Sequence, residues 1–302
     1  MASAAGWESP MSDVAASSAP IKSRAMAAAD TPTVVIRSTR GWAFHDIAEL
    51  WQNRELLYFL IWRDIKVRYK QTAIGAAWAV IQPLLMMVVF ILFFGRVAGI
   101  SSGDVPYAIF TFSALLPWQL FAFGLTLAST SLVVNERLIT KVYFPRILVP
   151  SAAVLAGLLD FGIAFLLLIG MMIYFGIVPT LAVLTLPLFV LLAVLAALGL
   201  SYWLSALDVQ YRDVRYTIPF LIQIWLLATP VFYPADLISG GWQILLALNP
   251  MAGVVEGFRW ALLGQGGTPE PLVGISAIVT VVMFVGGALY FRRVEKLMAD
   301  VV

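Results

Sequence analysis

A cluster of cationic side chains comes directly before a long uncharged stretch, and it is the first candidate for binding chemistry in this chain. The cluster consists of Arg63, Lys66, Arg68 and Lys70, and no charged residue follows it until Arg96. On a helix, Arg63, Lys66 and Lys70 would share one face, and Asp64 and Arg68 would form an i,i+4 pair. Cationic side chains at a membrane surface attract anionic lipid head groups, and each charge contributes about 1 kcal/mol to membrane binding. We therefore expect the cluster to contact lipid head groups, an anionic part of a substrate or a partner protein, and the residues alone leave these three open.

Three other charged residues lie inside apolar segments. Asp160 has no evident basic partner at the same depth, and an acid within a membrane is costly enough to be a functional candidate. Two roles are open to it, a structural hydrogen-bonded group or a proton relay. Glu256 and Arg259 are spaced i,i+3. We expect them either to pair at the outer membrane surface, where such pairs contribute about 0–1 kcal/mol, or to hold an outer gate.

Two short connections have the properties of docking elements for another protein. In the first, residues 135–146, the candidates are Asn135, Glu136, Leu138, Ile139, Lys141, Val142, Tyr143, Phe144 and Arg146. Asn135 can start a short helix and Pro145 can end it. Its apolar stripe needs a groove on another protein or on this one, and a plain basic loop would leave that stripe unexplained. The second connection, residues 208–215, adds Arg212 and Asp213.

Aromatic residues make up 13% of the chain and suggest a path for a substrate. Those near helix starts and in the outer segment are Trp78, Trp118, Phe121, Phe220, Trp225, Phe232, Tyr233, Trp242 and Trp260. The ordinary interpretation is an interfacial belt or core packing. The alternative is a lining, because aromatic faces could pass the C–H faces of a sugar polymer without binding it tightly.

The composition requires a membrane to hold these residues in place. The chain has 302 residues, of which 61% are hydrophobic and 12% charged, with a mean hydropathy of +0.92. Soluble domains have about 45–50% apolar and about 25% charged residues. The net charge of +2 gives no support for nucleic-acid binding. With no Cys and His45 as the single histidine, thiol catalysis and a histidine cluster within one chain are excluded, and we expect no metal site.

Nucleotide chemistry is not expected in this chain. A phosphate loop requires Gly before its Lys, and none of the five lysines follows a glycine. We therefore expect no cofactor bound by this chain. Any energy from ATP, with its Mg²⁺, must be supplied by a partner protein.

The sequence predicts an all-α integral membrane protein with six transmembrane helices. A span needs roughly 20 mostly apolar residues, and the candidates are 74–97, 107–134, 147–175, 180–207, 216–233 and 272–291. This arrangement places 17 of the 19 Lys and Arg residues on one side. By the positive-inside rule, both termini are expected to be cytoplasmic.

The remaining segments complete the predicted organisation. Residues 1–35 are expected to be a disordered cytoplasmic tail, and 36–73 a cytoplasmic interface segment whose stretch 41–52 forms an amphipathic helix. Residues 74–302 form the transmembrane domain. Within it, 234–264 are apolar but too short to cross twice, with Asn249-Pro250 as a turn. We expect a re-entrant or periplasmic helical hairpin that acts as an outer gate; a loop resting on the membrane is the alternative.

Four stretches in order resemble one known family. They are RDIKVRYKQTAIGAAWAVIQPL, NERLITKVYFPR, RDVRYTIPFLIQIWLLATPVFYP and LNPMAGVVEGFRWALLG. From about residue 36 to the C-terminus, the chain resembles the membrane subunits of polysaccharide-exporting ABC transporters (Wzm-type permeases). The resemblance implies a homodimer of permeases in the bacterial inner membrane, joined to two copies of a separate ATPase. The implied substrate is a lipid-linked O-antigen, capsule or teichoic-acid-like glycan.

The resemblance also implies roles for the candidate segments. Residues 41–52 resemble the interface helix, 135–146 the coupling helix that contacts the ATPase, and 234–264 the periplasmic gate. The cationic cluster would then lie at the cytoplasmic mouth, where lipid head groups, a substrate pyrophosphate and the ATPase are all within reach. Two alternatives stay open: an ABC permease for small lipophilic compounds, and a membrane enzyme acting on lipid-linked sugars.

Overall fold

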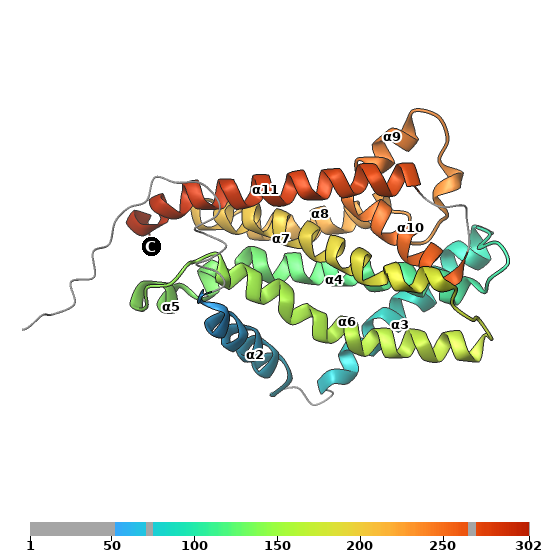
Figure 1. Ribbon diagram of the computed structural model, residues 1–302, viewed down its shortest axis with the longest axis horizontal. Coiled ribbons are helices and arrows are strands. Elements are labelled where there is room, and N and C mark those ends of the chain that lie inside the picture. The colour runs from blue at the N-terminus through green and yellow to red at the C-terminus, as the bar shows by residue number, and fades with distance from the viewer. Residues whose placement is uncertain (1–51, 71–74, 265–269, 302) are drawn as a thin grey trace, which may run out of the picture. The chain divides into compact units, whose positions relative to one another are not determined.

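The computed structural model describes residues 52–70, 75–264 and 270–301, and these residues form helices and connecting turns with no strand. Figure 1 shows the arrangement of the helices. The helices are α2 (Arg54–Lys70), α3 (Trp78–Phe90), α4 (Tyr107–Val134), α5 (Glu136–Lys141), α6 (Leu148–Tyr174), α7 (Leu186–Gln210), α8 (Val214–Ala228), α9 (Trp242–Ala247), α10 (Pro250–Leu263) and α11 (Glu270–Val301). A π-helical segment, Ile91–Val97, continues α3, and 3-10 turns occupy Gly75–Ala77, Leu181–Thr185 and Ala235–Leu237.

Five segments in the described part of the chain are long and apolar enough to cross a membrane. They are Trp78–Val97, Tyr107–Val134, Leu148–Tyr174, Leu181–Gln210 and Pro271–Glu295. They correspond to five of the six predicted spans, and the second has the predicted bounds. The predicted span 216–233 is instead the 15-residue helix α8. At 1.5 Å per residue it is about 22 Å long, less than the roughly 30 Å of a hydrocarbon core.

Helix α8 ends early for a local reason. Thr229 precedes Pro230 and has an extended backbone, with φ −102° and ψ 137°. The proline ring disfavours the helical conformation of the residue before it. The chain therefore turns at residues 229–233 and does not continue to the far side as helix.

Helix α4 lies at the centre of the helix bundle. Of the five long apolar segments it is the most buried, and it packs against α6, α7, α10 and α3. Its neighbours α6 and α7 are joined to each other by a buried hydrogen bond of 2.8 Å between Ser151 Oγ and the Tyr202 hydroxyl. Polar contacts of this kind hold helices together in lipid, where apolar burial alone does not.

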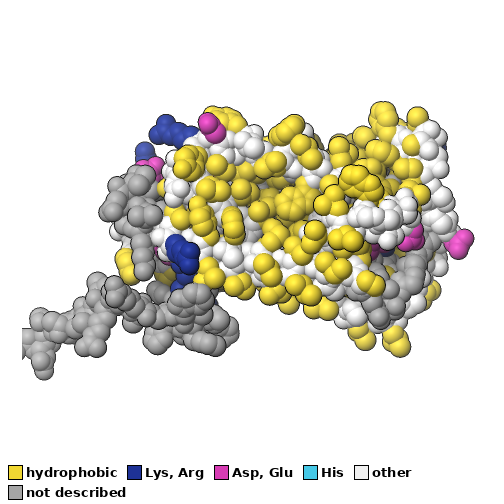
Figure 2. Space-filling model, turned by 90° about the horizontal axis from the view of Figure 1, so that it is seen from above, with side chains coloured by type: hydrophobic (Ala, Val, Ile, Leu, Met, Phe, Trp, Pro, Cys, Tyr) yellow, Lys and Arg dark blue, Asp and Glu magenta, His cyan; other side chains and the backbone are white. Residues whose placement is uncertain are grey.

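The two ends of the bundle carry different elements. Figure 1 places α5, the C-terminal end of α11 and the start of α2 at one end, with α9 and α10 at the other. On the face in Figure 2, apolar side chains cover the middle and charged side chains gather towards the ends. This distribution is that of a protein with a hydrocarbon-facing belt. The predicted amphipathic helix 41–52 and tail 1–35 lie outside the described residues, apart from Gln52.

Candidate functional site

Two of the four cations of the cluster on α2 are paired with carboxylates, Arg63 with Asp64 and Arg68 with Asp160. Arg68 donates a hydrogen bond to Asp160 Oδ2 on α6, and the Tyr69 hydroxyl donates one to Asp160 Oδ1. Arg63 Nη2 lies 2.8 Å from Asp64 Oδ1. The predicted Asp64–Arg68 pair is therefore wrong, and so is the expectation that Asp160 lacks a basic partner.

The other cations of the cluster are more exposed. Lys66 Nζ lies 5.4 Å from the centre of the Trp62 ring, within the range of a cation–π contact. Lys70, at the end of α2, is exposed. Of the four cluster residues, these two lysines therefore remain the more accessible charges for an anionic group.

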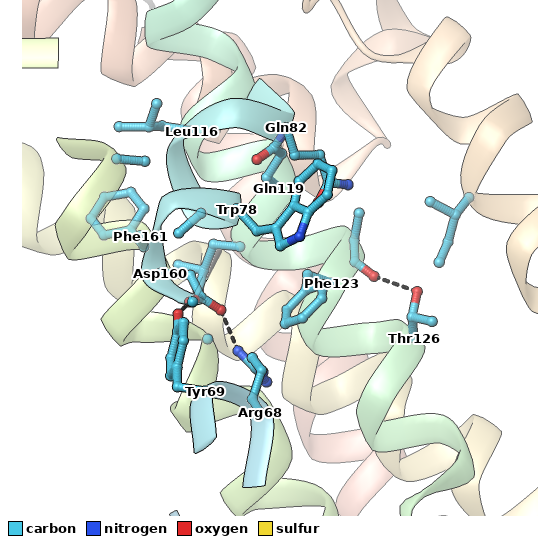
Figure 3. Close-up of a pocket in the computed structure, with 17 residues that line it drawn as sticks. Arg68, Tyr69, Trp78, Gln82, Leu116, Gln119, Phe123, Thr126, Asp160 and Phe161 are labelled. Atoms are coloured by element: carbon cyan, nitrogen blue, oxygen red, sulfur yellow. Dashed lines mark hydrogen bonds and ion pairs between the residues drawn. The ribbon is translucent and has the colours of Figure 1, made fainter. Parts of the chain in front are cut away.

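A cavity of about 510 Å³ lies beside the Arg68–Asp160 pair. Its wall includes Trp78 and Gln82 from α3, and Gln119 and Phe123 from α4. Figure 3 shows these side chains around a common space, with the ion pair at one edge. The Arg68 guanidinium carbon lies 4.4 Å from the centre of the Phe123 ring. The volume falls in the range of small-molecule sites, roughly 300–1,000 Å³.

The ion pair should couple α2 to α6 energetically. We expect Asp160→Ala to destabilise the protein more than the double variant Arg68→Ala/Asp160→Ala, because the single change leaves a guanidinium without its carboxylate. A coupling energy of about 1–2 kcal/mol is expected from a double-mutant cycle. Thermal melting of the purified variants in detergent measures it, and additive effects of the two changes would contradict it.

Some apolar residues of segment 135–146 pack against the protein core, and the others are exposed. Asn135 is the residue before α5, and Glu136 to Lys141 form that helix. Phe144 is buried, and Leu138 and Ile139 pack against the core. Val142 and Tyr143 are exposed, with Tyr143 at 92%. The predicted single stripe is therefore split, and its C-terminal part is the portion open to a partner.

The end of this segment is fastened to the last helix. The Arg146 backbone N–H donates to Glu295 Oε1 at 3.0 Å, and its Nη1 donates to the Glu295 carbonyl oxygen at 3.3 Å. In the connection 208–215, Arg215 Nε donates to the buried Asp208 Oδ1 at 3.3 Å. Arg212 and Asp213 are exposed on the same connection. Both loops are thus held by ion pairs or hydrogen bonds while their tips stay accessible.

At the other end of the bundle, Glu256 and Arg259 do form a pair, with 2.9 Å between Glu256 Oε1 and Arg259 Nη1. The pair is not at the surface as predicted, because Arg259 is only 2% exposed. Its guanidinium stacks on Phe110 and donates to the carbonyl oxygens of Val231 at 2.6 Å and Tyr233 at 3.1 Å. Burial raises the pKa of the Glu256 carboxyl, and the adjacent guanidinium opposes that shift. Arg259 therefore anchors the turn after α8.

A second polar cluster joins α8, α10 and α11 beside this anchor. Asn249 Oδ1 accepts hydrogen bonds from Trp225 Nε1 at 2.9 Å and from the Met251 N–H at 3.0 Å. Asn249 Nδ2 donates to Thr229 Oγ1 at 2.9 Å. Ser276 Oγ on α11 donates to the Asn249 carbonyl oxygen at 2.9 Å. Pro250 is the first residue of α10, so the predicted Asn249-Pro250 turn is present as the start of that helix.

The predicted aromatic lining does not gather in one place within this chain. Trp118, Phe121 and Phe232 are buried in the core; Phe220 and Trp242 are exposed; Trp225, Tyr233 and Trp260 are half-buried. Of the predicted aromatic residues, Trp78 alone lines the cavity, and the sequence prediction missed Gln82, Gln119 and Phe123. A sequence signal for the glutamines existed, since each is a polar residue within a predicted span.

The chain matches the family described as ABC-2 type transporter over residues 55–263. This match covers more than half of the chain, so the chain belongs to the ABC-2 type transporter family. It is accordingly a multi-pass membrane protein of a transporter rather than an enzyme.

Particular relatives carry more specific names. The O-antigen export system permease protein RfbA of Myxococcus xanthus is 31% identical over 83% of this chain and 96% of that protein. A protein of the same name from Klebsiella pneumoniae is 27% identical over 82% of this chain and 95% of its own length. The polysialic acid transport protein KpsM of Escherichia coli is 23% identical over 80% of this chain and 94% of its own length.

Proposed function

We propose that this chain is the channel-forming subunit of an ABC transporter that exports a lipid-linked polysaccharide across the bacterial inner membrane. The observation that carries the proposal is its similarity, over nearly their full length, to relatives named for O-antigen export and polysialic acid transport. Two copies of the chain would form the channel, and two copies of a separate ATPase would power it. Both termini would be cytoplasmic, as the distribution of Lys and Arg predicts.

The contacts of α5 suggest how the ATPase acts on the membrane helices. Helix α5 follows α4 directly, with Asn135 closing one helix and preceding the next. Phe144 is inserted in the core, and Arg146 is bonded to Glu295 on α11. A displacement of the exposed tip at Val142 and Tyr143 would therefore be transmitted to α4, α6 and α11 together. In this hypothesis, that movement widens a path between two protomers that the 234–264 segment closes.

Deletion of the gene in the source bacterium tests the proposed function. We expect surface polysaccharide to disappear, and its lipid-linked form to accumulate inside the cell until the intact chain is restored. Normal surface polysaccharide in the deletion strain would contradict the proposal. If that strain instead became sensitive to lipophilic compounds, a small-molecule permease would be indicated. If the purified chain modified lipid-linked sugars without an ATPase, it would be an enzyme.

A substitution at the exposed tip of segment 135–146 tests the contact with the ATPase directly. Tyr143→Ala is expected to weaken binding of the ATPase about thirtyfold or more, because truncating an aromatic hot-spot residue of an interface costs about 2 kcal/mol or more. Tyr174→Ala is the matched control, since Tyr174 is 83% exposed at the far end of α6. Binding is measured by recovery of the ATPase with the tagged permease. Equal recovery with the two variants would contradict the docking role.

A further inference from the structure

The cavity beside α3 contains two glutamine side chains that the proposed coupling does not use. Gln82 is an exposed residue of α3 and Gln119 a half-buried residue of α4. Within the described residues, neither side-chain amide makes a hydrogen bond to the protein. Figure 3 shows both amides close to the Trp78 indole.

Two free amides on spanning helices need a polar partner. Each side-chain amide has two N–H donors and a carbonyl acceptor, and an unsatisfied polar group in the hydrocarbon region costs several kcal/mol. Gln82 and Gln119 both belong to segments long and apolar enough to cross the membrane. Their side chains should therefore meet water or a polar ligand rather than lipid tails.

The rest of the wall selects the chemistry of that ligand. Trp78, Phe123 and Phe161 present aromatic surfaces to the cavity, which suit a ligand with apolar C–H faces. Arg68 and Asp160 are the charged residues of the wall, and they are paired with each other. Because the positive charge of the Arg68 guanidinium is already balanced by the Asp160 carboxylate, the cavity has little electrostatic attraction for a phosphate or pyrophosphate.

We propose that this cavity is a binding subsite for a short, uncharged sugar segment of the transported polysaccharide. The hydroxyl groups of the sugar would exchange hydrogen bonds with Gln82, Gln119 and the carboxylate of Asp160. The C–H face of its ring would lie against Trp78 or Phe123. The inference rests on the proposed function, and it assigns to this cavity the glycan rather than its lipid-linked pyrophosphate.

Photo-crosslinking in living cells tests the subsite. A photoreactive p-benzoylphenylalanine is introduced as Gln82→p-benzoylphenylalanine, and the control is Leu166→p-benzoylphenylalanine, at a position of α6 that is 69% exposed and outside the cavity. After irradiation, the purified permease is stained for glycan. We expect a glycan adduct from position 82 only, and its disappearance in cells in which polysaccharide synthesis is blocked. An adduct with lipid alone, an adduct with a second copy of the chain, or equal adducts at both positions would overturn the proposal.

Transport by unlabelled variants provides a second measurement that does not depend on the probe. Gln82→Leu/Gln119→Leu is expected to lower the export rate about tenfold while leaving recovery of the ATPase unchanged, because two hydrogen bonds to the glycan are lost. Gln223→Leu, at an exposed position of α8 outside the cavity wall, is the matched control and should export normally. Normal export by the double variant would overturn the subsite. If deletion of the whole gene left surface polysaccharide intact, the proposed function itself would fail, and the two failures are thus distinguishable.

Discussion

Replacing Arg259 by alanine is expected to lower the free energy of unfolding by about 3–5 kcal/mol, the range found when one partner of a buried ion pair is removed. The guanidinium is enclosed by Glu256, the Phe110 ring and the carbonyl oxygens of Val231 and Tyr233. Its removal leaves the largely buried Glu256 carboxylate and three carbonyl oxygens, those of Phe110, Val231 and Tyr233, without their donor. For a domain of this size, the loss corresponds to a melting temperature lower by about 10 °C.

Two controls separate the anchoring role from the loss of a positive charge. Arg96→Ala removes an exposed arginine at the end of the π-helical segment, and it should melt within about 2 °C of the parent protein. Arg259→Lys should recover little stability, because an ammonium cannot donate to several acceptors in one plane as a guanidinium does. If Arg259→Ala and Arg96→Ala melted alike in detergent, the turn after α8 would not depend on this anchor.

Adding a single methyl group at Gly199 is expected to destabilise the contact between α7 and α11. A Cβ atom there would lie 2.7 Å from the Phe284 backbone, closer than van der Waals contact allows. Because the obstacle is backbone rather than a movable side chain, the two helices would have to separate. Overpacking of this kind costs about 1–3 kcal/mol, and small residues at such crossings are what permit close approach of helices in lipid.

The matched control for Gly199→Ala is a glycine whose replacement is not expected to lower the stability of the protein. Gly162 lies within α6, and a Cβ atom added there would meet no other atom within 4 Å. Gly162→Ala should therefore leave stability unchanged or raise it by up to about 1 kcal/mol, since alanine loses less conformational entropy in a helix. Melting temperatures of the two purified variants measure the difference. Equal shifts for Gly199→Ala and Gly162→Ala would contradict the close approach of α7 and α11.

The spans could be predicted because they depend on local composition. Uninterrupted apolar runs located five long segments, and the run at 107–134 gave the bounds of α4. The early end of α8 was also predictable in principle from Pro230. It was missed because the apolar composition continues through Phe232 and hides the break in the helix.

The polar contacts could not be predicted because their partners are distant in the sequence. Arg68 and Asp160 are 92 positions apart, and Arg259 bonds to the carbonyl oxygens of Phe110, Val231 and Tyr233, which lie on two other segments. A backbone carbonyl acceptor cannot be recognised from the residue type. The sequence therefore predicted for Arg259 only an ion pair at the surface. Gln82 and Gln119 come together only through the packing of α3 against α4.

Movement of the glycan by the isolated proteins tests the central claim most directly. The permease and its ATPase are reconstituted in vesicles with the lipid-linked polysaccharide extracted from the deletion strain, and ATP is added outside. Where the ATPase faces outward, we expect ATP to move glycan into the vesicle, where it is protected from an added glycan-degrading reagent. Protection should require both proteins and hydrolysable ATP. Glycan that stayed fully accessible with ATP and both proteins present would contradict export through this chain.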